Sequence, residues 1–222
     1  MIRIFNGYVV LSSPKDEKHA EGIYKKDLPH VFVIGHNKIA TRSIDLMFKM
    51  SGYRALHWDK GNLAGTIKKN MQSNLPLLTH IDDYHCYSDM ESVGSFYAYE
   101  LFPLFDLQYP NSLFIYNHRP VSAWIESRKN HRKYLKVYRK KFNSRNNLKL
   151  SSKKKVEEHW RSFFERHEKR VFDYFKGKSN LIVVDIESSE SQSNLLSRLS
   201  SAGFKIDDSL TSLPVAGVTK KS

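Results

Sequence analysis

Hydrogen-bond donors gather where the first strongly apolar segment of the chain gives way to a helical pattern. The sequence from Val33 to Ile44 is VIGHNKIATRSI, with Gly35 at the turn and a helix expected from about Ala40. The first N–H groups of a helix lack partners within the helix and lie at the positive end of its dipole. Side chains add further donors at the same place: Lys38, Thr41, Arg42 and Ser43. This combination predicts a site for a phosphate-like anion.

Two other interpretations of this loop use the same residues. In an ordinary N-cap, Thr41 or Ser43 would accept a backbone hydrogen bond and Arg42 would stay in solvent. In a Walker A loop the pattern GxxxxGK[ST] would be present, but position 40 is Ala and Lys38 comes three residues after Gly35. The absence of that pattern disfavours a nucleotide kinase.

A second strand-to-helix junction carries a cation at the same kind of position. Leu113 to Tyr116 is an apolar run that predicts a buried strand, and Arg119 follows it directly. Pro120 suits the first turn of a helix, and Ser127 comes eight residues after Arg119. Since the guanidinium group binds phosphate with several hydrogen bonds at once, this arginine is a second candidate for anion binding.

The elements that would position these residues alternate along the chain. Five short apolar runs are predicted strands, at residues 30–35, 53–58, 75–79, 113–116 and 181–184. Helical patterns cover residues 41–50, 63–71, 96–108, 121 onward, 156–175 and a last helix around 195–199. This order predicts an α/β fold with a parallel sheet of about five strands and helices on both faces. Ligands of such sheets bind beyond the carboxyl ends of the strands, where both cationic elements are expected.

Together, the two elements resemble the sulfotransferases that use 3′-phosphoadenosine 5′-phosphosulfate (PAPS). That family has a GxxKxGTTxL loop after its first core strand, and Gly35 to Ile44 is similar to it except for Ala40 and Arg42. The spacing of Arg119 and Ser127 matches the family's 3′-phosphate element, and residues 99–127 are similar to a soluble, bacterial-type, single-domain branch. The resemblance covers about residues 30–200. It implies a P-loop-like fold and a set of residues that bind PAPS or its product PAP: Lys38, Ile39, Ala40, Thr41, Arg42, Ser43, Arg119 and Ser127.

The resemblance also implies catalytic residues for sulfuryl transfer to a hydroxyl or amine. Lys38 would stabilise charge on the donor. The general base in this family is a His or a carboxylate just after the strand that precedes the Arg strand, which points to His80 first, because its pKa is ordinarily near neutral. Asp83 and Asp82 come next, and Asp89 is a further candidate. The same stretch, with two His, three Asp and a Cys, matches no metal-binding spacing, and the family needs no metal for transfer.

The positive charge of the chain lies in one segment. Lys and Arg minus Asp and Glu give 36 − 23 = +13, and residues 128–155 hold 13 basic and no acidic residues, which leaves 36 − 13 = 23 basic against 23 acidic elsewhere. This basic helical insertion is either a solvated surface or a recognition element for an acidic acceptor such as an anionic glycan, and an anionic membrane surface is a variant of that idea. Specific nucleic-acid binding is not expected, because the body of the protein is neutral.

The remaining features describe organisation and location. Residues 1–29 predict an N-terminal hairpin or arm, and residues 30–222 the sulfotransferase-like α/β domain. No apolar run is long enough for a transmembrane helix, the N-terminus does not read as a signal peptide, and Cys86 is the single cysteine, so we expect a cytoplasmic protein.

Two hypotheses of different classes follow. The first is a PAPS-dependent sulfotransferase. The alternative is a catalytically degenerate sulfotransferase-like module that binds a polyanion through the basic segment, and Ala40 and Arg42 are the departures that favour it.

Overall fold

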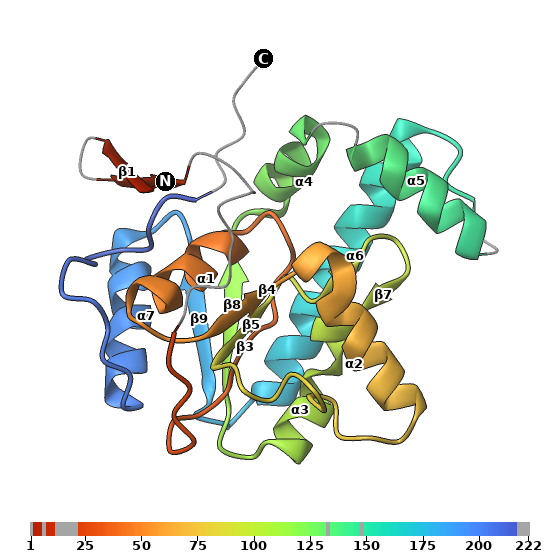
Figure 1. The fold of residues 1–222 in the computed structure, drawn as a ribbon. Helices are drawn as coiled ribbons and strands as arrows, with labels where there is room; N and C mark the ends of the chain where they lie inside the picture. The colour runs from red at the N-terminus through yellow and green to blue at the C-terminus, as the bar shows by residue number, and fades with distance from the viewer. Residues whose placement is uncertain (1, 6–7, 12–21, 132–133, 147–148, 217–222) are drawn as a thin grey trace.

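A five-stranded parallel sheet forms the centre of the protein in a computed structural model that describes residues 2–5, 8–11, 22–131, 134–146 and 149–216. The strands are β3 (Val31–Val33), β4 (Ala55–His57), β5 (Cys86–Ser88), β8 (Leu113–His118) and β9 (Leu181–Asp185). Their order in the sheet is β4-β5-β3-β8-β9, so the strand that leads into the anion loop lies in the middle (Figure 1). The expected α/β, P-loop-like architecture is confirmed.

The register brings the strand ends to one side of the sheet. Val31 pairs with Cys86 on one neighbour and with Leu113 on the other, and every pairing in this sheet is parallel. The segments that follow β3, β4, β5, β8 and β9 therefore leave the sheet at a common edge, which we call the carboxyl edge. Residues from five separate parts of the sequence can meet there.

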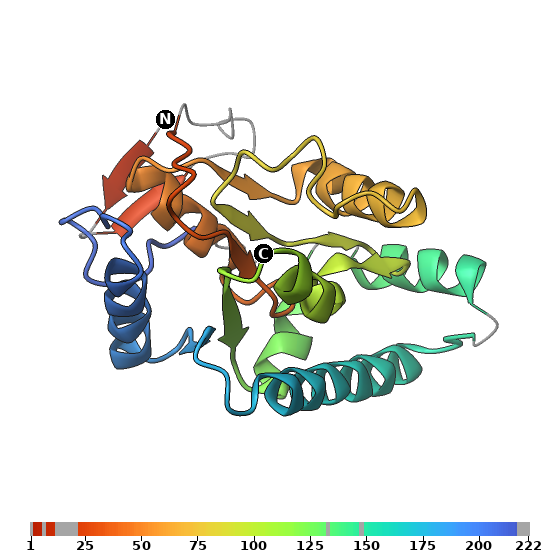
Figure 2. The same cartoon turned by 90° about the horizontal axis from the view of Figure 1, so that it is seen from below.

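Helices cover both faces of the sheet, as Figures 1 and 2 show. One face is covered by α1 (Thr41–Met50) and α7 (Ser189–Ser201), whose apolar side chains pack on Val31 and Val33. The other face carries α2 (Asn62–Gln72), α3 (Phe102–Gln108), α4 (Val121–Asn130) and α6 (Lys153–Phe175), which pack on Phe32 and Ile34. Alternation along β3 thus divides the core into two layers.

The expected strand at residues 75–79 is wrong. Residues 76–80 form turns after α2, where Asn70 Nδ2 donates to the carbonyl oxygens of Leu77 at 3.0 Å and Thr79 at 2.8 Å. Leu77 and Leu78 are buried there, against helices rather than in the sheet. The third strand of the central sheet along the chain, after β3 and β4, is instead β5 at Cys86–Ser88.

The expected helix over residues 96–108 is shorter than predicted. Phe96 and Tyr97 form strand β7, which pairs antiparallel with β6 (Glu91–Ser92). A 3₁₀ turn, η3 (Ala98–Leu101), follows, and α3 begins only at Phe102, with Pro103 in its first turn. The apolar residues at the start of the predicted helix belong instead to a hairpin that turns near Gly94, which has a φ of 69°.

The N-terminal segment and the basic segment were also assigned a structure from the sequence. At the N-terminus, β1 (Ile2–Phe5) and β2 (Tyr8–Leu11) pair antiparallel, as expected for residues 1–12, and residues 1, 6–7 and 12–21 lie outside the described chain. The basic segment forms the end of α4, then α5 (Tyr134–Arg145), then the start of α6, with residues 132–133 and 147–148 outside the description. Within the described residues, no helix has both the length and the apolar character needed to cross a bilayer.

Candidate functional site

The loop between β3 and α1 is held in shape by Asn117 of β8. The backbone N–H of Gly35 donates to Oδ1 of this buried asparagine at 3.0 Å, and Nδ2 of Asn117 donates to the carbonyl oxygen of Ile39. A Cβ at position 35 would lie 2.2 Å from Oδ1 of Asn117, so only glycine permits this approach. One side chain on the neighbouring strand thus bonds both ends of the loop.

Three further hydrogen bonds brace the loop from other elements. Nε1 of Trp124 donates to the carbonyl oxygen of Asn37 at 2.9 Å, and Asn37 Nδ2 donates to Oε1 of Glu91 at 2.7 Å. His167 on α6 lies with Nε2 2.6 Å from the carbonyl oxygen of Ile34. Burial lowers the pKa of His167 to about 4, so this imidazole is neutral at physiological pH and its Nε2–H donates.

The first turn of α1 begins without a side-chain cap. The N-cap is Ala40, in the left-handed conformation with a φ of 54°, and no side chain caps the helix. Thr41 and Ser43 are buried within the first turn and do not act as the cap that the alternative interpretation required. Lys38 precedes the cap with a φ of 65°, and together these two left-handed residues turn the chain into the helix.

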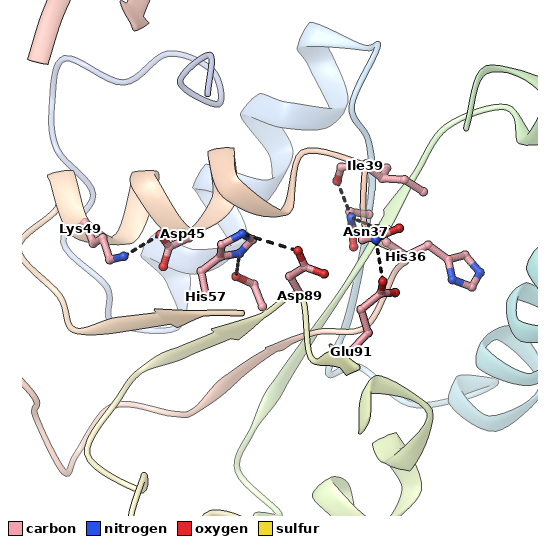
Figure 3. Close-up of polar contacts among 10 residues, drawn as sticks. His36, Asn37, Ile39, Asp45, Lys49, His57, Asp89 and Glu91 are labelled. Carbon is pink, nitrogen blue, oxygen red and sulfur yellow. Dashed lines mark hydrogen bonds and ion pairs between the residues drawn. The ribbon is translucent and has the colours of Figure 1, made fainter. Parts of the chain in front are cut away.

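A carboxylate occupies the position directly after β5. Asp89 has a φ of 53°, and its Oδ2 lies 3.7 Å from Nε2 of His57, the last residue of β4 (Figure 3). Nδ1 of the same histidine lies 2.9 Å from Oγ of Ser88. Two residues further on, Glu91 is buried and accepts the bond from Asn37 described above. Two carboxyl groups therefore stand next to the anion loop at the carboxyl edge.

The charged groups at this edge shift one another's pKa values. The pKa of Asp89 is raised to about 8, first by burial and then by the nearby charge of Glu91, while the charges of Lys38, Arg128 and Arg42 act in the opposite direction. Burial likewise lowers the pKa of Lys38, and the charges of Asp89 and Arg42 act on it with opposite signs. The loop lysine and the Asp89 carboxyl group thus belong to one electrostatic environment.

His57 stays neutral beside this carboxyl group. The pKa of His57 is lowered to about 3, first by burial and then by the positive charges of Arg42, Lys49 and Lys38. The contact with Asp89 is consequently one between a neutral imidazole and a carboxyl group at neutral pH.

Arg119 lies at the end of β8, as predicted, but it is held by an acidic residue. Its Nη2 lies 2.7 Å from Oε1 of Glu187, which follows β9, and its Nε is buried with no hydrogen-bond partner within the described residues. Ser127 is half-buried on α4, in its second turn. The strand end and the helix that follows it thus carry the two residues of the expected 3′-phosphate element.

Arg128 is a further cation of the site. The sequence analysis counted it only as the first residue of the basic segment. Its side chain is buried, with its guanidinium carbon 4.5 Å from the ring centroids of both Trp124 and Trp160 and 5.2 Å from that of Tyr138. Its charge acts on Lys38 and Asp89. Trp124 and Trp160 are 36 residues apart, so no local pattern indicates that they enclose this arginine.

The structure separates His80 and Asp83 from Lys38, which corrects the sequence-based placement. His80 is exposed, and Asp83 pairs with Arg54 at 2.5 Å. Both precede β5, whose first residues pair with the start of β3, and His30 Nδ1 lies 2.9 Å from the carbonyl oxygen of Tyr84 at that end. They lie at the amino-terminal edge of the sheet because the third strand is Cys86–Ser88 and not residues 75–79.

The residue that actually follows the third strand is Asp89, which the sequence offered only as a further candidate. Asp82 is exposed on the same side as Asp83. His57 and Glu91 were not identified, because β4 and β5 are each three residues long and give too little periodicity to locate their ends. Across the described residues, no three His, Cys, Asp or Glu side chains come together as a metal-binding group.

Comparison with known proteins is consistent with this arrangement. Residues 30–192, well over half of the chain, match the family model of the sulfotransferase domain. The matched range contains β3 and the anion loop, Asp89, and the Arg119 element. A search of curated proteins finds no match.

Proposed function

Because the chain belongs to the sulfotransferase domain family, we propose that it moves a sulfuryl group from PAPS to a hydroxyl or amine of an acceptor, with an anionic glycan as the acceptor class. The observation that carries this proposal is the placement of Lys38 and Asp89. They follow two neighbouring parallel strands, β3 and β5, and their charges act on each other at the carboxyl edge.

The residues present suit a donor with two anionic ends. The uncapped first turn of α1, together with Lys38 and Arg42, fits the 5′-phosphosulfate group. At the end of β8, the buried Nε of Arg119 has no hydrogen-bond partner within the described chain, which fits the 3′-phosphate. When bound, PAPS supplies the activated sulfuryl group and the leaving phosphate.

Lys38 and the α1 N-terminus would stabilise the charge that develops on the phosphate oxygen as its bond to sulfur breaks. The loop is rigid because Asn117 and Trp124 fix its carbonyl oxygens, so the backbone N–H groups need no rearrangement. Partial burial strengthens each of these interactions relative to water.

Asp89 would act as the general base. As the acceptor oxygen forms its bond to sulfur, its proton passes to the Asp89 carboxylate, and the sulfur–oxygen bond to the 5′-phosphate breaks. A pKa of about 8 makes this carboxylate a much stronger base than an ordinary aspartate, close to the pH at which it must work. His57, which is neutral and 3.7 Å away, would help to hold the carboxyl group in place.

The proposal is tested with donor labelled in its sulfuryl group. Wild-type protein should release label to an acceptor, and Asp89→Asn should bind PAP with nearly wild-type affinity but lose about 10²–10⁴-fold in turnover. His80→Asn is the matched control, because His80 is exposed at the opposite edge of the sheet, and it should remain fully active. Full activity of Asp89→Asn would contradict the role of Asp89.

The second candidate is the catalytically degenerate polyanion-binding module. Ala40 in a left-handed conformation and Arg42 in place of a family threonine favour it, because both alter the donor loop. Binding of PAP without release of label to any acceptor, and without donor hydrolysis, would support this candidate over the enzyme.

A further inference from the structure

Helix α5 carries a set of cations that have no acidic partners among the residues that the structure describes. Its sequence YLKVYRKKFNSR contains no Asp or Glu. The set consists of Lys136, Arg139, Lys140, Lys141 and Arg145, and within the described residues none of them forms an ion pair with a carboxylate. In the part of the basic segment that the structure describes, Lys129, Lys153 and Lys155 do form ion pairs, with acidic residues on α4 and α6. We call these five side chains the α5 basic face.

The cations of the α5 basic face repel one another. Lys136 and Lys140 are four residues apart, as are Lys141 and Arg145, and like charges at this spacing destabilise a helix by about 0.2–0.5 kcal/mol per pair. Four of the five cations are exposed, and Arg139 is half-buried. A bound polyanion would remove this repulsion and release counterions at the same time.

The helix is nonetheless firmly held. The Tyr138 hydroxyl lies 3.1 Å from Nε2 of His159 on α6 and 3.3 Å from the Tyr97 hydroxyl of β7. Asn143 bonds to both the N–H and the carbonyl oxygen of Leu150, at 2.8 and 3.2 Å, which closes the connection toward α6. The basic face is therefore a fixed surface and not a free arm.

The same contacts connect the α5 basic face to the reaction centre. Tyr97 pairs with Glu91 in the β6–β7 hairpin, and Tyr138 lies against the guanidinium of Arg128. Burial lowers the pKa of His131, at the end of α4, and the charge of Lys38 lowers it further, so this end of α4 lies near the anion loop. Figure 1 shows α4 and α5 on the side of the sheet toward which β8 points.

We infer that the α5 basic face binds an acidic polysaccharide as the acceptor and directs one of its hydroxyl groups toward Asp89; this inference rests on the proposed function. Lys136 and Arg145 are nine residues apart, so the cations are spread along about 14 Å of helix, which suits a repeating polyanion better than a single small anion. A polysaccharide with carboxylate or sulfate groups supplies both the regular charge and the hydroxyl nucleophiles.

Two charge-matched variants test this inference. The first neutralises the exposed part of the face with Lys136→Gln, Lys140→Gln, Lys141→Gln and Arg145→Gln, and leaves Tyr138 and Phe142 in place. The control neutralises four exposed lysines elsewhere, with Lys26→Gln, Lys69→Gln, Lys176→Gln and Lys205→Gln. Both variants lose four positive charges, so a difference between them reports the location of the charges and not the net charge.

The probe is a non-sulfated chondroitin hexasaccharide, with maltohexaose as the neutral comparison. Binding is measured by calorimetry without donor. We expect the α5 variant to bind chondroitin at least about tenfold more weakly than wild type and with a weaker salt dependence, and the control variant to bind almost as wild type. Under turnover conditions the KM for chondroitin should rise with little change in kcat.

Several results would overturn the inference. Equal chondroitin affinity of all three proteins would do so, as would equal weakening in both variants. Binding to phosphatidylserine vesicles or to poly(U) RNA, with none to chondroitin, would assign the face to another partner. PAP affinity is measured on the same proteins: if wild type does not bind PAP, the proposed function fails independently, whereas equal PAP affinity in all three leaves the chondroitin comparison as the test of the face.

Discussion

The guanidinium group of Arg119 and the carboxylate of Glu187 form an ion pair of 2.7 Å at the ends of two adjacent strands, β8 and β9. If Arg119 binds the 3′-phosphate of the donor, that phosphate competes with Glu187 for the guanidinium group. The acidic residue is about half exposed, at 47%, so it can turn into solvent at small cost. The pair thus keeps the arginine oriented and competes with the phosphate.

We expect Glu187→Gln to bind PAP more tightly, by up to about fivefold, because an exposed ion pair contributes about 0.2–1 kcal/mol. Affinity for adenosine 5′-phosphosulfate, which lacks the 3′-phosphate, should not change. Glu165→Gln, an exposed carboxylate on α6, is the control. Calorimetric titration with both nucleotides checks this, and weaker PAP binding by Glu187→Gln would contradict it.

Arg119→Ala should show the opposite preference. Loss of a hydrogen bond to a charged group costs about 1.5–3 kcal/mol, so PAP affinity should fall by about 10- to 150-fold. Adenosine 5′-phosphosulfate should lose much less. Equal losses for the two nucleotides would mean that Arg119 acts only as a partner of Glu187.

The raised pKa of Asp89 predicts how stability depends on pH. A folded-state pKa of about 8 against an ordinary value of 3.8 means that the folded protein holds this proton while the unfolded chain releases it. The ionised group therefore destabilises the fold progressively as pH rises from about 4 to about 8. Asp89→Asn removes this penalty, and we expect it to raise the free energy of unfolding at pH 9 by about 2–5 kcal/mol, with little difference at pH 4.

Thermal unfolding at several pH values measures this effect. Asp208→Asn replaces an exposed carboxylate and should change the melting temperature little at any pH. A destabilised Asp89→Asn protein at pH 9 would show that the ionised carboxylate makes favourable contacts in the fold.

The same group should govern the pH dependence of activity. A general base must be ionised, so kcat/KM should rise with pH and reach half of its maximum near pH 8. His57 should add no inflection between pH 5 and 9, because its pKa is about 3. The profile is measured with labelled donor at low substrate, and a flat profile from pH 6 to 9 would exclude Asp89 as the base.

Two positions of the anion loop should respond to substitution in opposite directions. Ala40 has a φ of 54°, which costs an alanine about 1 kcal/mol, so Ala40→Gly should leave stability unchanged or raise it by up to about 1 kcal/mol. Gly35→Ala would place a methyl group 2.2 Å from Asn117 Oδ1 and should destabilise the protein strongly. Chemical denaturation compares the two, and a stable Gly35→Ala protein would mean that the loop is less fixed than its hydrogen bonds indicate.

The sequence by itself determined the elements whose signals are local. Gly35 between an apolar run and a helical pattern marks the anion loop, and the longer strands β8 and β9 have enough apolar residues to be recognised without tertiary information. Arg119 was placed correctly because it directly follows such a strand. The alternation of these elements was sufficient for the fold class.

Only the tertiary structure decided which residues join that loop. Strand β5 has three residues, Cys86–Ser88, and its pairing with β3 on one side and β4 on the other identifies it as a strand where the sequence does not. That pairing places Asp89 at the carboxyl edge and His80 at the opposite edge. The burial of Arg128 likewise cannot be predicted from the local sequence, because it depends on Trp124 and Trp160 from two helices that meet only in the folded protein. Short strands and enclosed charges are defined by contacts between distant segments, and the local pattern of residue types does not encode them.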